Sequence, residues 1–269
     1  MEIRMRTIII GDLHGMYDEA VELLDKCKAS SSDHVIFLGD LIDRGRDNDK
    51  CVDLAMRMET RQGRPACILG NHEERHLQYD DIEQRKGHVN VNPPTHVATR
   101  QQLTRAHYNY FRSLPLYLRL PEHNIVCVHA GVYPNRRIED QTPKHLLHVQ
   151  NIRPYDKWGN RTNDESTMWT SRCVQERPES ELWQFWTNFW TGPETVVFGH
   201  TVLDRPLIEE KVIGLDGGGC FGRELWALIM PGRELVRLKC SGNSDPADLI
   251  RRGNREARTF KVHGDVGTW

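Results

Sequence analysis

Short apolar runs alternate with longer amphipathic stretches through the first half of the chain. The runs hold four or five residues, the length of buried strands, and the stretch from Asp18 to Lys28 repeats its apolar residues at helical spacing. This alternation predicts an α/β layered fold with parallel strand pairing. We expect strands at Arg6–Ile10, Val35–Leu38, Ala66–Leu69, Ile125–Val128 and Thr195–Phe198, and helices at Asp18–Lys28, Asp49–Arg61 and from Glu73 onward.

The rest of the chain follows other patterns. Residues 78–100 are polar and contain two adjacent prolines, which predicts a surface excursion, and residues 133–180 are irregular and long enough to form a functional loop region. From Lys211 to Lys239 the pattern predicts three strands separated by a glycine-rich turn and a Pro-Gly turn. Residues 241–269 are polar and rich in Arg and Gly, so we expect one domain over 1–240 followed by a tail.

Composition narrows the class of protein. Lys and Arg total 36 against 38 for Asp and Glu, a balance that argues against a protein held to nucleic acid mainly by charge. No run of about 18 apolar residues occurs, so we expect no membrane span. The seven cysteines include no CxxC pair, and the N-terminal apolar run is too short for the core of a signal peptide. Both observations favour reduced thiols in a cytoplasmic protein. The pattern leaves the oligomeric state open.

Glycines and potential metal ligands follow each of the expected strands. Open α/β sheets gather their sites at the carboxyl ends of strands, so these segments can converge on one point. A single Asp or His at a strand end is commonplace, but five segments of the same form favour a shared site. They are Gly11-Asp12-Leu13-His14-Gly15, Gly39-Asp40-Leu41-Ile42-Asp43-Arg44-Gly45, Gly70-Asn71-His72-Glu73, His129-Ala130-Gly131 and Gly199-His200-Thr201.

The donor types indicate which metals suit such a site. Asp, Asn and His offer oxygen and nitrogen without thiolate, which argues against a structural zinc site. Manganese, iron and zinc suit this mixture, whereas magnesium prefers all-oxygen ligands. Two ions about 4 Å apart can bridge a hydroxide and clamp both phosphate oxygens.

The ordered motifs GDLHG, GDLIDRG, GNHE, VHAG and GHT resemble the phosphoprotein phosphatase family of calcineurin-like metallophosphoesterases. That family also contains symmetrical dinucleoside tetraphosphate hydrolases such as diadenosine tetraphosphatases. The similarity runs from residue 7 to about 240. It implies a metallophosphoesterase catalytic domain over 1–240, with a central β-sandwich of two mixed sheets flanked by helices.

The resemblance also implies a ligand set for two divalent ions, with Mn²⁺ the first choice and iron or zinc the alternatives. Asp40 would bridge the ions, and a bridging hydroxide would attack phosphorus directly without a phosphoenzyme intermediate. The implied ligands are Asp12 and His14 for the first ion, Asp40 for both, and Asn71, His129 and His200 for the second.

Further residues would act on the substrate according to the same resemblance. Arg44 and Asn71 would contact the phosphate, and Arg172 is the candidate for the second phosphate-binding arginine of the family. His72 would protonate the leaving oxygen, with Asp43 holding its tautomer and orientation.

Three other patterns have simpler explanations. His72 to His76 spell the zinc-protease pattern HExxH, but His72 directly follows a strand end, so we expect His76 to be an ordinary helix-face residue. The GxGxxG segment at 217–222 precedes a strand, so a tight turn near the metals is expected, with Asp216 either a supporting carboxylate or a turn residue. Aromatic residues at helical spacing over 183–190 mainly predict core packing.

Two substrate classes remain in competition. The glutamate after Asn71-His72 and the Asp43-Arg44-Gly45 segment favour a Ser/Thr protein phosphatase acting on phosphoprotein monoesters. The Leu215–Cys220 segment and the absence of a longer C-terminal region favour the alternative, a dinucleoside polyphosphate hydrolase. A degenerate binding module is not expected, because all the implied ligands are present.

Overall fold

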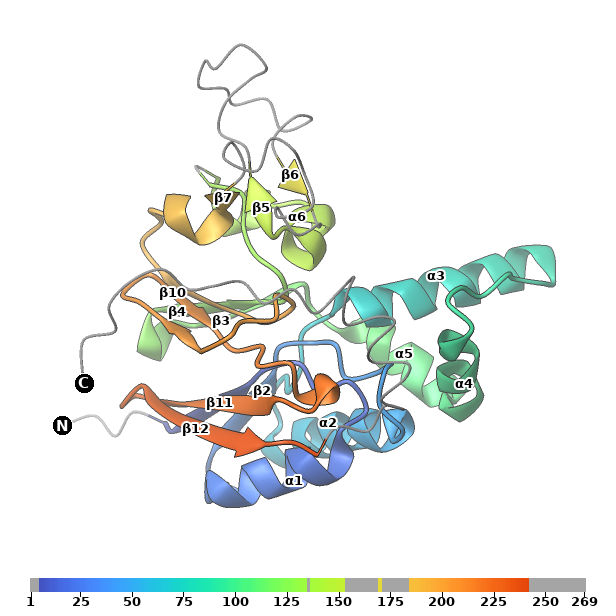
Figure 1. Cartoon of the computed structure of the whole chain (residues 1–269), viewed down its shortest axis with the longest axis horizontal. Coiled ribbons are helices and arrows are strands. Elements are labelled where there is room, and N and C mark those ends of the chain that lie inside the picture. The colour runs from blue at the N-terminus through green and yellow to red at the C-terminus, as the bar shows by residue number, and fades with distance from the viewer. Residues whose placement is uncertain (1–4, 135, 153–168, 171–183, 242–269) are drawn as a thin grey trace, which may run out of the picture.

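Two β-sheets stacked face to face form the centre of the molecule (Figure 1). The computed structural model describes residues 5–134, 136–152, 169–170 and 184–241. Helices lie beneath the lower sheet in the view of Figure 1, and a group of helices extends to one side. The expected α/β metallophosphoesterase fold, two mixed sheets flanked by helices, is confirmed.

The first sheet has four strands in the order β12-β11-β1-β2. β1 pairs in parallel with β2, while the other neighbouring pairs are antiparallel. Two helices cover the outer face of this sheet, and α1 packs against it through Ala20, Leu23 and Leu24. These elements are β1 (Thr7–Ile10), α1 (Tyr17–Lys26), β2 (His34–Phe37), α2 (Asn48–Gln62), β11 (Glu224–Met230) and β12 (Glu234–Lys239).

The second sheet has five strands in the order β3-β4-β8-β10-β9. Its central strands β4, β8 and β10 run parallel to one another, and the two edge strands are antiparallel to their neighbours. The strands are β3 (Tyr117–Leu120), β4 (Ile125–Val128), β8 (Thr195–Phe198), β9 (Leu207–Ile208) and β10 (Val212–Gly214).

The alternation of side chains along β1 explains why its apolar run is continuous. Ile9 points into the space between the sheets, where it joins a core with Ile36 of β2. Ile8 and Ile10 point the other way, into the core between this sheet and the helices α1 and α2. A strand that is buried on both faces needs apolar residues at every position.

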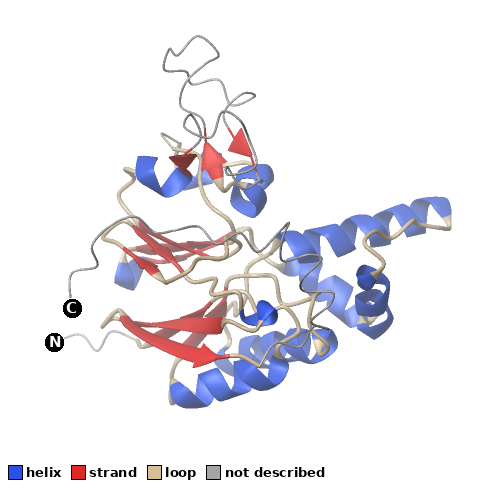
Figure 2. Cartoon of the chain, viewed as in Figure 1, coloured by secondary structure: helices blue, strands red, loops and turns tan. Residues whose placement is uncertain are grey.

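Smaller elements complete the described chain (Figure 2). A helical arm of α3, α4 and α5 projects to one side, and a three-stranded sheet with α6 lies above the second sheet in Figure 1. The helices are α3 (Asn71–Lys86), α4 (Thr95–Gln102), α5 (Arg105–Ser113) and α6 (Pro143–His148), and the strands are β5 (Asn151–Ile152), β6 (Trp169–Thr170) and β7 (Gln184–Phe185). The 3₁₀ turns are η1 (Pro121–His123), η2 (Ile138–Asp140), η6 (Trp186–Phe189) and η7 (Gly219–Phe221).

Two predicted segments differ from the structure. Ala66–Leu69 is extended but forms only a single bridge, between Cys67 and Phe37, because the backbone N–H of Leu69 donates to Pro115 instead of continuing a ladder. Residues 78–100 are not a simple excursion, since α3 continues to Lys86 and α4 begins at Thr95. No helix in the described parts of the chain is long and apolar enough to cross a bilayer.

The aromatic segment near residue 186 packs in the core, as predicted, although it forms a 3₁₀ turn rather than a longer helix. The Trp186 side chain is fully buried, and its ring lies 5.1 Å from that of Phe198 in β8. The six described cysteines are free and buried. The proposed tail after residue 240 lies almost wholly outside the described residues, so that domain boundary stays a prediction.

Candidate metal centre

The carboxyl ends of β1, β2, β4 and β8 meet at one edge of the sandwich, where β1 and β2 are parallel in one sheet and β4 and β8 are parallel in the other. The first sheet therefore supplies Asp12, His14 and Asp40, while the second supplies His129 and His200. Asn71 begins α3 beside them. The structure brings together all six residues implied as metal ligands.

Several of these residues adopt a backbone conformation that is rare outside glycine. Left-handed backbone costs a residue with a side chain about 1–2 kcal/mol and concentrates at functional sites. Neighbouring glycines let the loops approach closely: a Cβ on Gly39 would lie 2.7 Å from the backbone of Gly70. The residues of the implied site with positive φ are His14 (47°), Asp40 (49°), Asp43 (69°), Arg44 (69°) and His200 (62°).

Hydrogen bonds to backbone carbonyls fix the tautomers of two of the histidines. His14 Nδ1 lies 2.8 Å from the carbonyl oxygen of Ile42, and His129 Nδ1 lies 2.7 Å from that of Leu38. A carbonyl oxygen can only accept, so Nδ1 carries the proton in both rings. Burial lowers the pKa of both histidines, which keeps them neutral and leaves a lone pair on each Nε2.

Both lone pairs lie near the oxygens of other ligands, and that of His14 also accepts from Arg44. His14 Nε2 lies 3.5 Å from Asp40 Oδ2, and His129 Nε2 lies 3.4 Å from Asp40 Oδ1. Asn71 Oδ1 lies 2.8 Å from His129 Nε2 and 2.9 Å from His200 Nδ1. Around His129 Nε2 the electron pairs of the nitrogen, Asp40 and Asn71 repel one another unless a cation lies among them.

Buried negative charge in the site also favours a bound cation. Burial raises the pKa of Asp12 well above its usual range, and the nearby carboxylates of Asp216 and Asp40 add to the rise. Burial also raises the pKa of Asp216 to about 6. Asp216 serves as a turn residue, since its Oδ1 accepts from Gly218 N at 2.9 Å, while its Oδ2 is buried without a hydrogen-bond partner among the described residues. Divalent cations would stabilise such a cluster.

The donor set therefore fits divalent metal. Two groups of potential ligands share Asp40, and within each group the ligand atoms lie within 4.8 Å of one another. One consists of His14, Asp40 and His72, and the other of Asp40, His129 and His200. The sharing of one carboxylate is the arrangement expected for a bridged pair of ions.

The His72 ring stands at the rim of this centre with the orientation predicted for it. Its Nδ1 donates to Asp43 Oδ2 at 2.6 Å, and its Nε2 accepts from Arg44 Nη2 at 3.3 Å. Burial alone would lower the pKa of His72, but the carboxylates of Asp40 and Asp43 outweigh it and raise that pKa. Arg44 also donates through Nη1 to His14 Nε2 at 2.6 Å, so its guanidinium lies between the metal ligands and His72.

The prediction that His76 is an ordinary helix-face residue is wrong. Its side chain is fully buried, and its Nε2 lies 3.0 Å from Asp43 Oδ1. The i, i+4 spacing of HExxH does place two histidines on one face of α3, but that face meets a carboxylate.

Two residues that sequence reasoning missed complete the surroundings of Asp43. Thr99 Oγ1 donates to it at 2.6 Å, and His96 Nε2 lies 3.2 Å away. Both belong to α4, whose approach to the site no local motif announces. Burial would raise the pKa of Asp43, but the bonds from His72 and His76 outweigh it and hold that pKa far below its usual range.

Glu73 has a structural task at the start of α3. Its carboxylate accepts backbone N–H bonds from Asp40 at 2.9 Å, Leu41 at 2.8 Å and Gly70 at 3.1 Å. It thereby holds the Asp40 loop against the helix that carries Asn71. The remaining predicted site residue, Arg172, lies outside the described residues.

Comparison with known proteins agrees with this geometry. Residues 5–217 match the calcineurin-like phosphoesterase family. An asymmetrical bis(5'-nucleosyl)-tetraphosphatase, PrpE, of Halalkalibacterium halodurans is 29% identical over 251 residues, which cover 87% of this chain and 94% of the relative. A symmetrical bis(5'-nucleosyl)-tetraphosphatase of Psychromonas ingrahamii is 32% identical over 154 residues, covering 55% of this chain and 51% of the relative.

Solved structures support the same assignment. A "putative diadenosine tetraphosphatase" is 26% identical, with a TM-score of 0.70 and coverage of 89% of this chain and 95% of that one. A serine/threonine phosphatase from Saccharomyces cerevisiae shares the fold at 15% identity, with a TM-score of 0.54 and coverage of 91% and 82%. The chain belongs to the calcineurin-like phosphoesterases and is a metal-dependent phosphoric ester hydrolase.

Proposed function

We propose that the chain hydrolyses dinucleoside polyphosphates and cleaves bis(5'-nucleosyl) tetraphosphates asymmetrically. The observation that carries the proposal is the nearly full-length similarity to relatives named as asymmetrical tetraphosphatases, of which 94% and 91% are covered in the first two. The symmetrical relative is matched over only 51% of its length. A site with clustered metal ligands, a guanidinium and a paired histidine supports phosphate chemistry of this kind.

We assign two divalent ions, with Mn²⁺ first, to Asp12, His14, Asp40, Asn71, His129 and His200. When bound, such a pair supplies an activated water and neutralises charge on the phosphate. Arg44 then donates to the phosphate oxygens in a forked geometry. His72, once its Nε2 is protonated in place of the bond from Arg44, gives that proton to the leaving oxygen, and Asp43 keeps the other ring nitrogen protonated.

A Ser/Thr protein phosphatase is the less favoured reading. The glutamate after Asn71-His72 supported that class, but Glu73 is fully buried and binds backbone N–H groups. The likeness to the yeast phosphatase, at 15% identity, concerns the fold alone.

The experiment is a side-by-side assay of the Mn²⁺-loaded protein on diadenosine tetraphosphate and on a phosphothreonine peptide. We expect kcat/KM to be at least about tenfold higher for the dinucleotide, a difference of roughly 1.4 kcal/mol in transition-state stabilisation. Chromatography should resolve ATP and AMP as the products. The Asp40→Asn variant is the control, because a shared ligand is removed without a change of volume.

Other results would change the assignment. Two molecules of ADP as the products would replace asymmetrical with symmetrical cleavage. Preference for the peptide would overturn the dinucleotide proposal. Turnover that survives in Asp40→Asn would show that a contaminant acts.

A further inference from the structure

A pocket with a volume of about 200 Å³ opens beside His72 and is lined in part by α3. Arg44 and His72 line it beside the metal ligands. It is also lined by Arg75 of α3 and by residues at and before the start of α4, including Asn92 and Thr95. Of the six implied metal ligands, Asn71 alone is among the described residues that line this pocket.

Arg75 brings to the pocket a positive charge that no carboxylate of the described residues pairs with. Two other arginines of the helical arm pair with carboxylates: Arg100 with Glu83 at 2.5 Å, and Arg105 with Asp80 at 2.8 Å. The exposed guanidinium of Arg75 makes no hydrogen bond or ion pair with any residue in the described ranges. A cation left unpaired at the wall of a pocket is available to an anion.

The one carboxylate in the pocket wall does not offset this charge. Asp43 is 1% exposed, and its oxygens already accept from Thr99 and the neighbouring imidazoles. With Arg44 and Arg75 both lining the pocket, its accessible charge is positive.

The position of Arg75 shows which part of a substrate it would meet. It follows His72 by three residues on the same face of α3, a little less than one turn or about 4.5 Å along the helix. His72 lies on the side of the leaving oxygen if it donates the proton there, so the pocket lies beyond that oxygen.

We propose that this pocket binds the phosphate groups of the leaving nucleotide, with Arg75 as the residue that recognises them. The inference rests on the proposed function, in which His72 protonates the leaving group. It makes the site selective for phosphoanhydrides, because an alcohol or phenol leaving group carries no anion to place against Arg75. The pocket thus distinguishes a nucleoside polyphosphate from a simple monoester.

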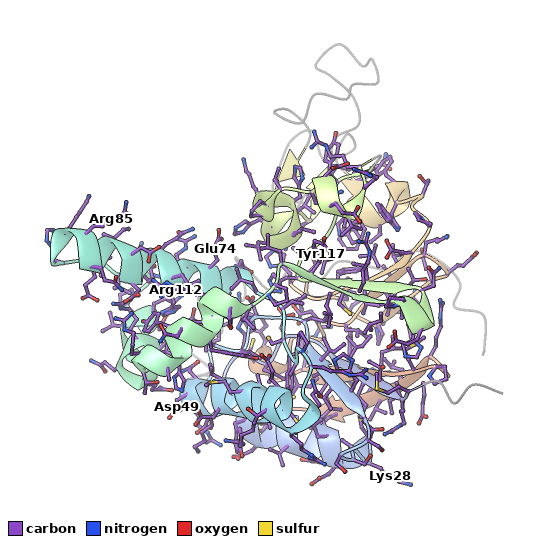
Figure 3. The ribbon with its side chains drawn as sticks, turned by 180° about the vertical axis from the view of Figure 1, so that it is seen from behind. Lys28, Asp49, Glu74, Arg85, Arg112 and Tyr117 are labelled. Carbon is purple, nitrogen blue, oxygen red and sulfur yellow. The ribbon has the colours of Figure 1, made fainter. Side chains whose placement is uncertain are left out.

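The test compares Arg75→Ala with Arg85→Ala, which removes the same charge from the far end of the same helix (Figure 3). For each protein, kcat/KM is measured on diadenosine tetraphosphate and on p-nitrophenyl phosphate. We expect Arg75→Ala to lower the ratio of the two constants about fivefold, the effect of an exposed charged contact. Arg85→Ala should keep the parent ratio. An unchanged ratio in Arg75→Ala would overturn the proposal.

Inhibition tests the pocket independently of the proposed function. Inorganic tripolyphosphate and phosphate are each used as competitive inhibitors of p-nitrophenyl phosphate hydrolysis. Arg75→Ala should weaken inhibition by tripolyphosphate about fivefold more than inhibition by phosphate. Failure of diadenosine tetraphosphate turnover together with this selective loss would refute the proposed function but support the pocket. Equal weakening of both inhibitors would refute the pocket.

Discussion

Asp43 shows how much one residue can depend on its neighbours. Its carboxylate accepts from His72 at 2.6 Å and Thr99 at 2.6 Å, and His76 and His96 lie 3.0 and 3.2 Å away. With both oxygens occupied, the carboxylate cannot turn away from His72. The Asp43–His72 pair is therefore held in one geometry before a substrate arrives.

The role of His72 can be separated from metal binding at this scale. We expect His72→Asn to lower kcat by about 10²–10⁴, the usual contribution of a general acid, while metal content stays near that of the parent. Steady-state kinetics and elemental analysis of the same preparations measure the two quantities. Loss of metal in the variant would instead make His72 a ligand, as its place beside His14 and Asp40 allows.

Sequence reasoning found the residues that lie in local motifs and missed those that folding brings in. Asp12, Asp40 and His129 each lie within three residues of the end of a strand, so their convergence could be predicted from sheet geometry alone. His96 and Thr99 approach from α4, about 50 residues after Asp43. Nothing in the sequence around them specifies that contact.

At the scale of elements, α3 organises the site. Its first turn carries Asn71 and His72, and its second turn carries Arg75 and His76. Its far half projects away from the sandwich, as Figure 3 shows by the positions of Glu74 and Arg85. Sequence reasoning placed the start of this helix correctly, but the polar residues after 78 concealed its length, since a helix exposed on most sides has little apolar pattern.

The packing of α3 against α5 depends on Asp80. Its carboxylate binds Arg105 through both oxygens, at 2.8 and 3.1 Å, and Arg112 at 2.9 Å. Burial would raise the pKa of Asp80, but the two arginines outweigh it and lower that pKa.

We expect Asp80→Asn to lower the free energy of unfolding by about 1–2 kcal/mol near neutral pH, because two guanidinium groups lose their anion. A lowered pKa stabilises the fold at pH values above the ordinary carboxyl pKa of about 3.9. The difference in unfolding free energy between Asp80→Asn and the parent should therefore narrow only below that pH. Urea unfolding across a pH series measures this gap. Asp81→Asn, at an exposed ion pair with Arg112, should cost less than about 0.5 kcal/mol. Equal losses in both variants would refute the assignment.

At the scale of the whole molecule, the candidate metal centre joins the two sheets. Asp12 and Asp40 follow strands of the first sheet, whereas His129 and His200 follow strands of the second. Metal bound to all of them would oppose separation of the sheets, so binding energy would add to folding stability.

Removal of metal should therefore destabilise the fold as well as stop turnover. We expect a chelator to lower Tm by several degrees, since metal at 100 times its Kd contributes about 2.7 kcal/mol. Mn²⁺ added back in excess should restore both Tm and activity. In Asp40→Asn the same treatment should shift Tm much less. A chelator that abolishes activity without moving Tm would show that the ions do not couple the sheets.

The split of the ligands between the sheets also orders events during synthesis. His200 lies 129 residues after Asn71 in the chain. At about 5–20 residues per second, a ribosome needs on the order of ten seconds to reach it after Asn71 has been made. Throughout that interval Asp12 and Asp40 lack His200 and the strand β8 that precedes it. The nascent chain thus passes through a stage with an incomplete ligand set, and only the synthesis of β8 and His200 would let the proposed metal pair close.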